Sequence, residues 1–327
     1  MRKIGPKYFV IAAALCAAWP ALADDSTAEL SAGGIVFTQN ADIRMASEDL
    51  RVSPYDVKVR YEFVNDSGHD IDTIVAFPLP DVDMEKLVET PLGRMTDDSK
   101  NFVNFRATAD GKPIALQFER KAIHNGKDIS DKVRAAGLDV DIYSDAYHTK
   151  LDNLAPAKKK QLKDRGLMNL DENWVQPVWI VQTRYWWRQH FPAGKTTVIE
   201  HEYAPVTGQS MFDKYNLEGH YWKDFHDKFC VDRATETQIR HDVTTRPPQK
   251  GNAYYMYQVY DTGFVLKTAR NWKGPIGRFH LTLDKLKPLS IISLCWKGAL
   301  KKTGPTTYES DLRDFAPAQD LRMVVLE

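Results

Sequence analysis

The stretch HYWKDFHDKFC holds the highest density of side chains that could bind a metal ion or transfer protons. On a helix, His220, Asp224 and Asp227 fall at positions i, i+4 and i+7 of one face. His226 and Cys230 share a second face. Either face could supply two metal ligands, but neither forms a complete set, and the chain has no HExxH or CxxC motif. We favour a packed amphipathic helix without metal or cofactor, and keep a metal-dependent enzyme that uses this stretch as the alternative.

The stretch DVDIYSD places three aspartates, Asp139, Asp141 and Asp145, in the order of a calcium-binding loop. Such a loop needs Gly at its sixth position and Glu at its twelfth. This chain has Ser144 and Lys150 at those positions. The pattern therefore predicts a solvated acidic turn rather than a calcium site.

No complete set of catalytic residues stands elsewhere in the sequence. Ser210, in GQSMF, lacks the second glycine of a nucleophile elbow, and no glycine-rich loop could hold a phosphate. We therefore assign no catalytic residue. A hydrolase would gain support if its candidate acids and bases converged in one cleft of the folded chain. These candidates are His201, His220, His226 and the aspartates of GLDVD.

The aromatic run VWIVQTRYWWRQHF is the best candidate for a binding surface. Strand alternation places Arg184, Trp186 and Arg188 on one face, opposite the side chains that fill the core. The indole could stack on a sugar ring, and the two cations beside it could bind an anion. Trp272, in the turn NWKGPIG, is a further candidate, and its context leaves open whether it packs or projects.

A second interpretation of the same run needs no ligand. If residues 192–194 form the turn of a hairpin, Arg184 falls near Glu202 on the partner strand. Trp186 then falls near Glu200. We favour this interpretation, because cations and carboxylates that meet across an exposed strand pair satisfy one another.

Short strands separated by turns position these residues. Residues 57–63 alternate apolar and polar side chains, as a half-buried strand does. NDSGHD, residues 65–70, is a turn, because Asn, Asp and Gly tolerate the backbone angles of a reversal. Asp110 and Gly111 stand at the centre of a predicted hairpin. Strands at this spacing indicate an antiparallel sandwich.

The chain predicts a mainly β fold with one helical interruption. An N-terminal antiparallel β-sandwich covers residues 24–209, and residues of about 125–170 have the composition of a helical insertion. A boundary near Ser210 separates the sandwich from a helix and a second, C-terminal β-rich unit over residues 210–327.

The N-terminus reads as a secretory signal peptide over residues 1–23. Arg2, Lys3 and Lys7 precede an apolar run that ends in Ala-Leu-Ala. Cleavage takes three basic side chains from the 44, which leaves 41 against 44 acidic ones and a formal charge of −3. This balance does not indicate nucleic-acid binding. We expect a periplasmic or secreted protein that is not an integral membrane protein after cleavage.

Two cysteines remain after that cleavage, Cys230 and Cys295. An even count in an oxidising compartment predicts a disulfide between them, 65 residues apart in sequence. Large apolar neighbours surround both, so we expect each cysteine to face the core of the C-terminal unit. The alternative is two buried, reduced cysteines that never meet.

Five long stretches together resemble the bacterial secreted family of domain of unknown function 4424. They keep the family's order and span nearly the whole mature chain. The resemblance implies an exported bacterial protein whose activity is not established, and it brings no catalytic residues. The stretches are LSAGGIVFTQNADIRMASEDLRVS, VRYEFVNDSGHDIDTIVAFPLPD, FPAGKTTVIEHEYAPVTG, NWKGPIGRFHLTLDK and LCWKGAL.

Two further segments carry a similarity at the level of the fold. They are FPLP at residues 77–80 and the Pro-Ala-Gly turn at residues 192–194. Together with the strands around them, these features are similar to the vault protein inter-alpha-trypsin domain. That resemblance implies a β-sandwich of the kind used in extracellular and structural assemblies, and by analogy a binding role.

Two function classes follow from these observations. The first is a non-catalytic envelope or extracellular module that binds a protein or a glycan. The second is an exported hydrolase, or a metal-dependent enzyme, built around the segment from His220 to Cys230. A complete catalytic or ligand set would favour the second class, and the sequence does not contain one.

Overall fold

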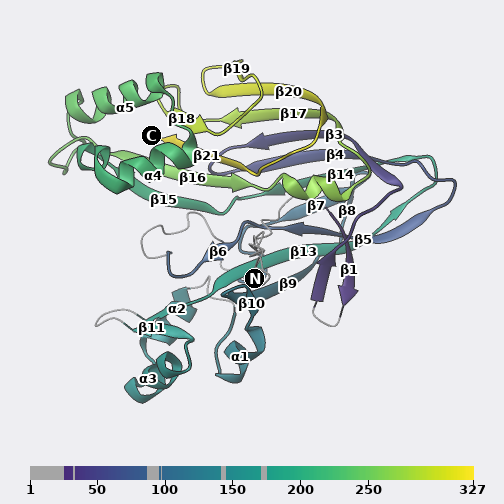
Figure 1. Ribbon diagram of the computed structural model, residues 1–327, viewed down its shortest axis with the longest axis horizontal. Helices are drawn as coiled ribbons and strands as arrows, with labels where there is room; N and C mark the ends of the chain where they lie inside the picture. Colours follow the sequence, from purple (N-terminus) through teal and green to yellow (C-terminus); the bar gives the residue numbers. More distant parts are fainter. Residues whose placement is uncertain (1–25, 32–33, 87–95, 97, 141–144, 171–174) are drawn as a thin grey trace, which may run out of the picture.

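The computed structural model describes residues 26–327 apart from 32–33, 87–95, 97, 141–144 and 171–174 (Figure 1). Strands make up 44% of the described residues and helices 19%, which confirms the mainly β prediction. The predicted signal peptide lies outside the described residues. Within the described ranges, no helix has the length and apolar character needed to cross a membrane.

The first sheet has seven strands in the order β10-β9-β13-β5-β1-β2, with β6 beside β13. Among the described residues, its neighbouring strands are all antiparallel. The strands are β1 (Ser26–Ser31), β2 (Gly34–Phe37), β5 (Ile71–Pro78), β6 (Val82–Asp83), β9 (Gln117–His124), β10 (Lys127–Asp128) and β13 (Ile180–Phe191).

The second sheet has eight strands in the order β19-β20-β17-β3-β4-β14-β7-β8. Its β3–β17 pair is parallel, and its β7–β8 hairpin turns at Asp110 and Gly111, as predicted. The strands are β3 (Ile43–Val52), β4 (Val57–Asn65), β7 (Arg106–Ala109), β8 (Lys112–Pro113), β14 (Thr196–Tyr203), β17 (Ile276–Asp284), β19 (Lys301–Lys302) and β20 (Thr307–Phe315).

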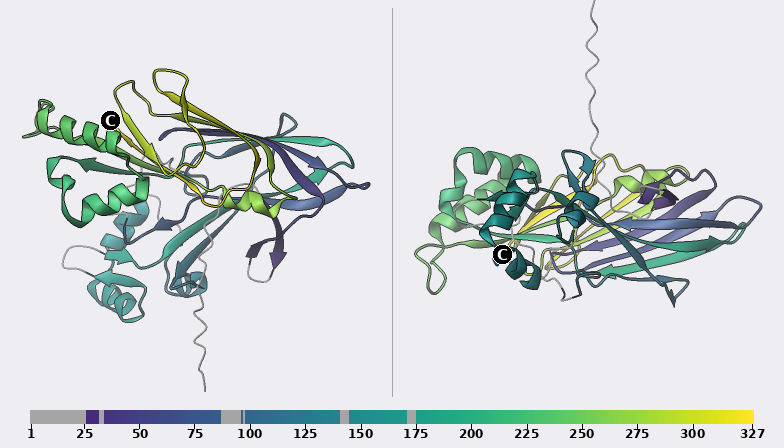
Figure 2. Two further views of the ribbon diagram at one scale, coloured as in Figure 1. Left: turned by 45° about the horizontal axis from the view of Figure 1, so that its top comes forward. Right: turned by 90° about the horizontal axis from the view of Figure 1, so that it is seen from below.

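A third sheet and two groups of helices complete the chain. The third sheet has the order β15-β16-β21-β18, and α4 and α5 lie beside it at one end of the molecule (Figures 1 and 2). Its strands are β15 (Thr207–Phe212), β16 (Tyr257–Phe264), β18 (Ile291–Leu294) and β21 (Leu321–Leu326), and its helices are η1 (Lys214–Leu217), α4 (Gly219–Phe229) and α5 (Arg233–Thr245). A short 3-10 helix, η2 (Lys267–Asn271), precedes β17.

The predicted helical insertion is confirmed between β10 and β13. Its helices are α1 (Ser130–Ala135), α2 (Asp145–Asp152) and α3 (Pro156–Asp164), and a two-stranded ribbon of β11 (Met168–Leu170) and β12 (Val175–Pro177) follows. In Figure 1 these elements lie below the first sheet, at a distance from α4 and α5.

The first and second sheets face each other as two layers with an aromatic core between them (Figure 1). Phe77 of β5 lies 5.0 Å from the ring of His201 on β14 and 4.9 Å from the ring of Phe105. Trp187 of β13 approaches His201 from the same layer as Phe77, at 5.5 Å. These contacts join the layers, because the rings come from strands of opposite sheets.

The chain crosses between the two layers at residues 66–70 and again at residues 192–195. The predicted hairpin at residues 192–194 is therefore wrong: β13 pairs with β5 and β9, while β14 pairs with β4 and β7. Both strands present apolar side chains, and crossing over lets each face the core from its own layer. Gly194 N donates to Asn65 O at 2.9 Å, and Asn65 N donates to Lys195 O at 3.2 Å, so the two crossings support each other.

The second sheet combines strands from both sides of the predicted boundary near Ser210. Strands β17, β19 and β20 follow that residue, whereas β3, β4, β7, β8 and β14 precede it. The main hydrophobic core likewise includes Phe63 and Phe279. The domain boundary near Ser210 remains a prediction. The second sheet contains strands from both sides of it.

Candidate ligand-binding groove

A groove of about 730 Å³ opens at the edge of the first sheet, beside the start of β9. Phe118, Glu119 and Arg120 all line it. Side chains of consecutive strand residues point to opposite faces, so a groove that contacts all three must wrap around the edge of the strand. We call this feature the β9 groove.

The strand next to β9 in the sheet is short. Strand β10 pairs only with Ile123 and His124, and the chain then turns into α1. Beyond it, the Ala122 carbonyl accepts from Ile129 N at 2.8 Å, and the Ala122 amide donates to Ser130 Oγ at 3.0 Å. Among the described strands, residues 117–121 pair with β13 alone.

Arg184 lies behind the groove and pairs with Glu119 on β9, not with Glu202 as predicted. The Arg184 guanidinium donates to Glu119 Oε2 at 3.1 Å and stacks 5.2 Å from the ring centre of Phe37. Its side chain is 12% exposed, so the predicted exposed position of Arg184 is also wrong. Glu202 instead pairs with Lys58 at 3.4 Å on the second sheet.

Trp186 is the predicted binding residue that lines the groove. Much of its indole packs against Ala28, Ile74, Ala76 and Phe37, which form a small apolar cluster on the outer side of the first sheet. Arg188 is exposed and does not line the groove. The three candidates therefore have different surroundings: Arg184 forms a salt bridge, Trp186 lines the groove, and Arg188 lies exposed on the surface.

Arg120 lines the groove from the core side, and the sequence interpretation missed it. It is buried between the rings of Phe102 and Phe118, at 5.4 and 5.6 Å, and its Nε donates to Thr183 Oγ1 at 3.1 Å. The signal was available in QFERKAIH, because alternation places Arg120 on the same face as Ala122. An arginine at an inward strand position marks a partnered, structured site.

The far wall of the groove comes from the helical insertion. Tyr147 of α2 donates its hydroxyl to Asp139 O at 2.8 Å and accepts from Asp139 N at 3.1 Å, which holds Asp139 against α2. The Asp139 carboxylate pairs with Lys150 at 3.5 Å and is well exposed. This matches the predicted solvated acidic turn at Asp139. Asp141 lies outside the described residues.

A second cavity, of about 460 Å³, lies on the outer face of the second sheet. Its cations already have carboxylate partners: Lys58 and Arg106 both approach Glu202, at 3.4 and 3.8 Å, and Arg60 pairs with Glu62 at 2.7 Å. Matched charges on an exposed sheet face satisfy one another, so this cavity is a weaker candidate than the β9 groove.

Helix α4 carries the predicted metal candidates on its exposed side. His220 pairs with Asp224 at 3.1 Å, and His226 with Asp227 at 3.4 Å. A hydrogen bond from Lys223 lowers the pKa of the Asp227 carboxyl. In the part of the chain that the structure describes, no three His, Cys, Asp or Glu side chains gather where they could hold a metal ion.

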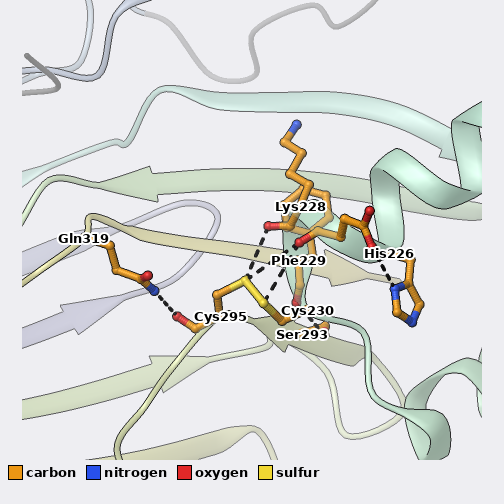
Figure 3. Close-up of a disulfide and its surroundings, with 8 residues drawn as sticks. His226, Lys228, Phe229, Cys230, Ser293, Cys295 and Gln319 are labelled. Atoms are coloured by element: carbon orange, nitrogen blue, oxygen red, sulfur yellow. Dashed lines mark hydrogen bonds and ion pairs between the residues drawn. A yellow bond between two sulfur atoms is a disulfide. The ribbon is translucent and has the colours of Figure 1, made fainter. Parts of the chain in front are cut away.

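Cys230 ends α4 and forms the predicted disulfide with Cys295, with Cα atoms 5.0 Å apart (Figure 3). The bond removes Cys230 as a metal ligand. It does not lie in the core as predicted: Cys230 is exposed and Cys295 partly buried. The reason is that Cys230, with a φ of 50°, caps the helix outside the packed Phe225 and Phe229.

The histidines and aspartates of the hydrolase alternative do not converge among the described residues. His201 is 3% exposed inside the sandwich, and burial lowers its pKa to about 3. Asp139 stands at the β9 groove, while His220 and His226 lie on α4 beside the third sheet (Figure 1). Trp272 is buried 4.5 Å from the ring of Phe63, so it packs rather than projects.

The family model described as "Domain of unknown function (DUF4424)" matches residues 23–324. The chain belongs to this family. The match covers both layers of the sandwich, the insertion that walls the β9 groove, and the third sheet. No curated protein matches the chain.

Solved structures give only distant likenesses to this DUF4424 chain. A Legionella pneumophila protein described as a "putative nutrient binding protein" is 15% identical, with a TM-score of 0.45 over 92% of this chain and 69% of that one. An M1 zinc metallopeptidase of Deinococcus radiodurans is 8% identical, with a TM-score of 0.26. The likeness covers 89% of this chain and 44% of that peptidase. At these TM-scores neither protein bears on what the chain binds.

Proposed function

We propose that this chain is an exported bacterial binding module without catalytic activity, which acts in the cell envelope or outside the cell through the β9 groove. The observation that carries the proposal is the groove itself. It brings Trp186, Phe118 and Arg120 of the first sheet together with Arg134 and Asp139 of the insertion. Pockets of about 300–1,000 Å³ that combine aromatic walls with a few polar groups are typical of ligand sites.

Three further features support the proposed location and role. The pattern of residues 1–23 predicts export. The disulfide between Cys230 and Cys295 suits an oxidising compartment. The likeness of the FPLP and Pro-Ala-Gly segments to the vault protein inter-alpha-trypsin domain adds a binding role by analogy. The envelope ligand would be a protein or a glycan.

Cross-linking in intact cells tests the proposal. The wild-type chain should form adducts with one or a few envelope components. Leu30→Asp and Phe118→Ser alter exposed groove residues and should lower the adduct yield at least tenfold. Leu289→Asp is the matched control, because Leu289 is 76% exposed and lies outside the groove. Equal adduct yields in the groove variants and the wild type would refute the assignment of the groove.

A further inference from the structure

A further cavity, of about 350 Å³, lies where the end of β20 meets the segment between η2 and β17. We call it the η2 pocket. Its volume is near the lower end of the range of about 300–1,000 Å³ that is typical of small-molecule sites, so it suits a small ligand better than a segment of chain. Its walls are largely apolar and include Trp272, Ile276, Phe315 and Pro317.

Two charged side chains also line the η2 pocket, Arg270 of η2 and Asp314 of β20. Both are exposed, and neither forms an ion pair or a side-chain hydrogen bond with another described residue. The other cation of η2 differs, because Lys267 pairs with Asp320 at 3.1 Å. The pocket therefore offers one guanidinium and one carboxylate that a ligand could pair.

An irregularity in β20 explains why an aspartate lines an apolar pocket. Consecutive residues of a regular strand point to opposite faces, yet Asp314 and Phe315 both line the η2 pocket. Asp314 has a φ of 49°, and it has no partner in the described register of β17 and β20. Irregularities of this kind re-aim a side chain. The carboxylate can therefore share the pocket with the Phe315 ring.

The chemistry of the η2 pocket matches a zwitterion with an apolar side chain. A guanidinium binds a carboxylate through two parallel hydrogen bonds, and a carboxylate binds an ammonium group through charge-assisted ones. The aromatic and proline walls suit an apolar group. A ligand with a single charge would cover either Arg270 or Asp314 without pairing it, which lowers the affinity.

We propose that the η2 pocket binds a free amino acid with an apolar side chain. Arg270 pairs with the α-carboxylate of the ligand, Asp314 pairs with its α-ammonium group, and its side chain packs against Phe315 and Pro317. This inference goes beyond the proposed function, because it assigns a second site that shares no lining residue with the β9 groove.

Isothermal titration of the purified mature chain tests the inference with L-phenylalanine and two analogues that each lack one charge. Phenylpropanoate lacks the ammonium group, and phenylethylamine lacks the carboxylate. Each should bind at least about tenfold more weakly than L-phenylalanine, because one ion pair is lost. L-Leucine should also bind, whereas L-glutamate and L-lysine should bind at least about tenfold more weakly, because their charged side chains would enter apolar surroundings.

Two substitutions connect each charge of the pocket to one group of the ligand. Arg270→Gln should weaken the binding of L-phenylalanine at least about tenfold and leave that of phenylethylamine unchanged. Asp314→Asn should weaken L-phenylalanine equally and leave phenylpropanoate unchanged. Asparagine tolerates a positive φ as aspartate does, so this variant keeps the backbone. Arg313→Gln is the matched control, because Arg313 is exposed and does not line the pocket.

Several outcomes would overturn the inference. L-Phenylalanine might show no binding, either analogue might bind as tightly as the amino acid, or Arg313→Gln might weaken binding as much as Arg270→Gln. The groove variants Leu30→Asp and Phe118→Ser should bind L-phenylalanine as the wild type does. A failed cross-linking test of the β9 groove would therefore leave the η2 pocket standing, and a failed titration would leave the proposed function standing.

Discussion

The side chain of Asn65 donates a hydrogen bond from Nδ2 to the backbone carbonyl of Phe191 at 2.9 Å, across 126 positions of sequence. The same nitrogen donates to His69 O at 2.8 Å, and Oδ1 accepts from Ser67 N at 3.0 Å. Asn65 is fully buried. One amide thus joins the two places where the chain crosses between the layers of the sandwich.

Replacing Asn65 with Ala should destabilise the protein by about 2–4 kcal/mol, because the buried carbonyl of Phe191 would lose this donor and the turn from Asn65 to His69 would lose its side-chain bonds. Urea unfolding at pH 7 measures the change. Asn153→Ala is the control: Asn153 is exposed, and its side chain donates to Thr149 O within its own helix turn, so its loss should cost under about 0.5 kcal/mol. Equal effects of the two substitutions would show that Asn65 is not the link between the crossings.

Removing the disulfide should cost about 4 kcal/mol by the chain-entropy model, since the bond closes a loop of 65 residues. The double variant Cys230→Ser, Cys295→Ser should show this loss in urea unfolding, and reduced wild type should match it. Adding reductant should not change the stability of the variant. A loss below about 1 kcal/mol would mean that the bond does little to restrict the unfolded chain.

Arg184 and Glu119 should be energetically coupled, whereas Arg184 and Glu202 should not. Both side chains of the first pair are largely buried, at 12% and 18% exposure, so breaking it should cost about 1–3 kcal/mol. Double-mutant cycles with alanine measure the coupling, which we expect to exceed about 1 kcal/mol for Glu119 and to stay below about 0.5 for Glu202. A larger coupling of Arg184 to Glu202 than to Glu119 would instead support the hairpin predicted at residues 192–194.

The stability of the fold should fall in mild acid because of His201. Burial lowers its pKa to about 3, below the ordinary 6.5. Below pH 6.5 the unfolded chain takes up a proton that the folded chain refuses, so stability is full above pH 6.5 and falls towards pH 3. The loss between pH 7 and pH 5 should reach about 2 kcal/mol.

His201→Leu checks this explanation. Urea unfolding of the variant should lack that 2 kcal/mol dependence between pH 7 and pH 5, whatever its stability at pH 7. Between pH 8 and pH 9, where His201 is neutral in both states, wild type and variant should keep a constant difference. Parallel pH curves for the two proteins from pH 7 to pH 5 would assign the acid sensitivity to other groups.

Cleavage of the exported chain should follow Ala23 and leave Asp24 as the first residue. Mass spectrometry of protein from the envelope fraction reports this directly. Strand β1 begins two residues later, at Ser26, and its first three residues are buried. A chain that retains Met1 in a membrane fraction would contradict the predicted signal peptide.

Local patterns in the sequence were sufficient to predict the strands, several turns and the disulfide. Alternation in residues 57–63 and in the run around Trp186 identified which side chains face the core. Asp110 and Gly111 adopt positive φ angles of 48° and 74°, which their residue types tolerate in a tight turn. The pairing of Cys230 with Cys295 followed from an even count in a predicted oxidising compartment.

Only the tertiary structure decided which strands are neighbours, and therefore which residues form the groove. Alternation defines the two faces of a strand but not its partners, so Arg184 was assigned to Glu202 instead of Glu119. The β9 groove gathers Leu30, Lys100, Phe118, Arg134 and Trp186 from separate parts of the chain. No local pattern encodes that gathering, because the core that the two layers share fixes which strands and loops come together.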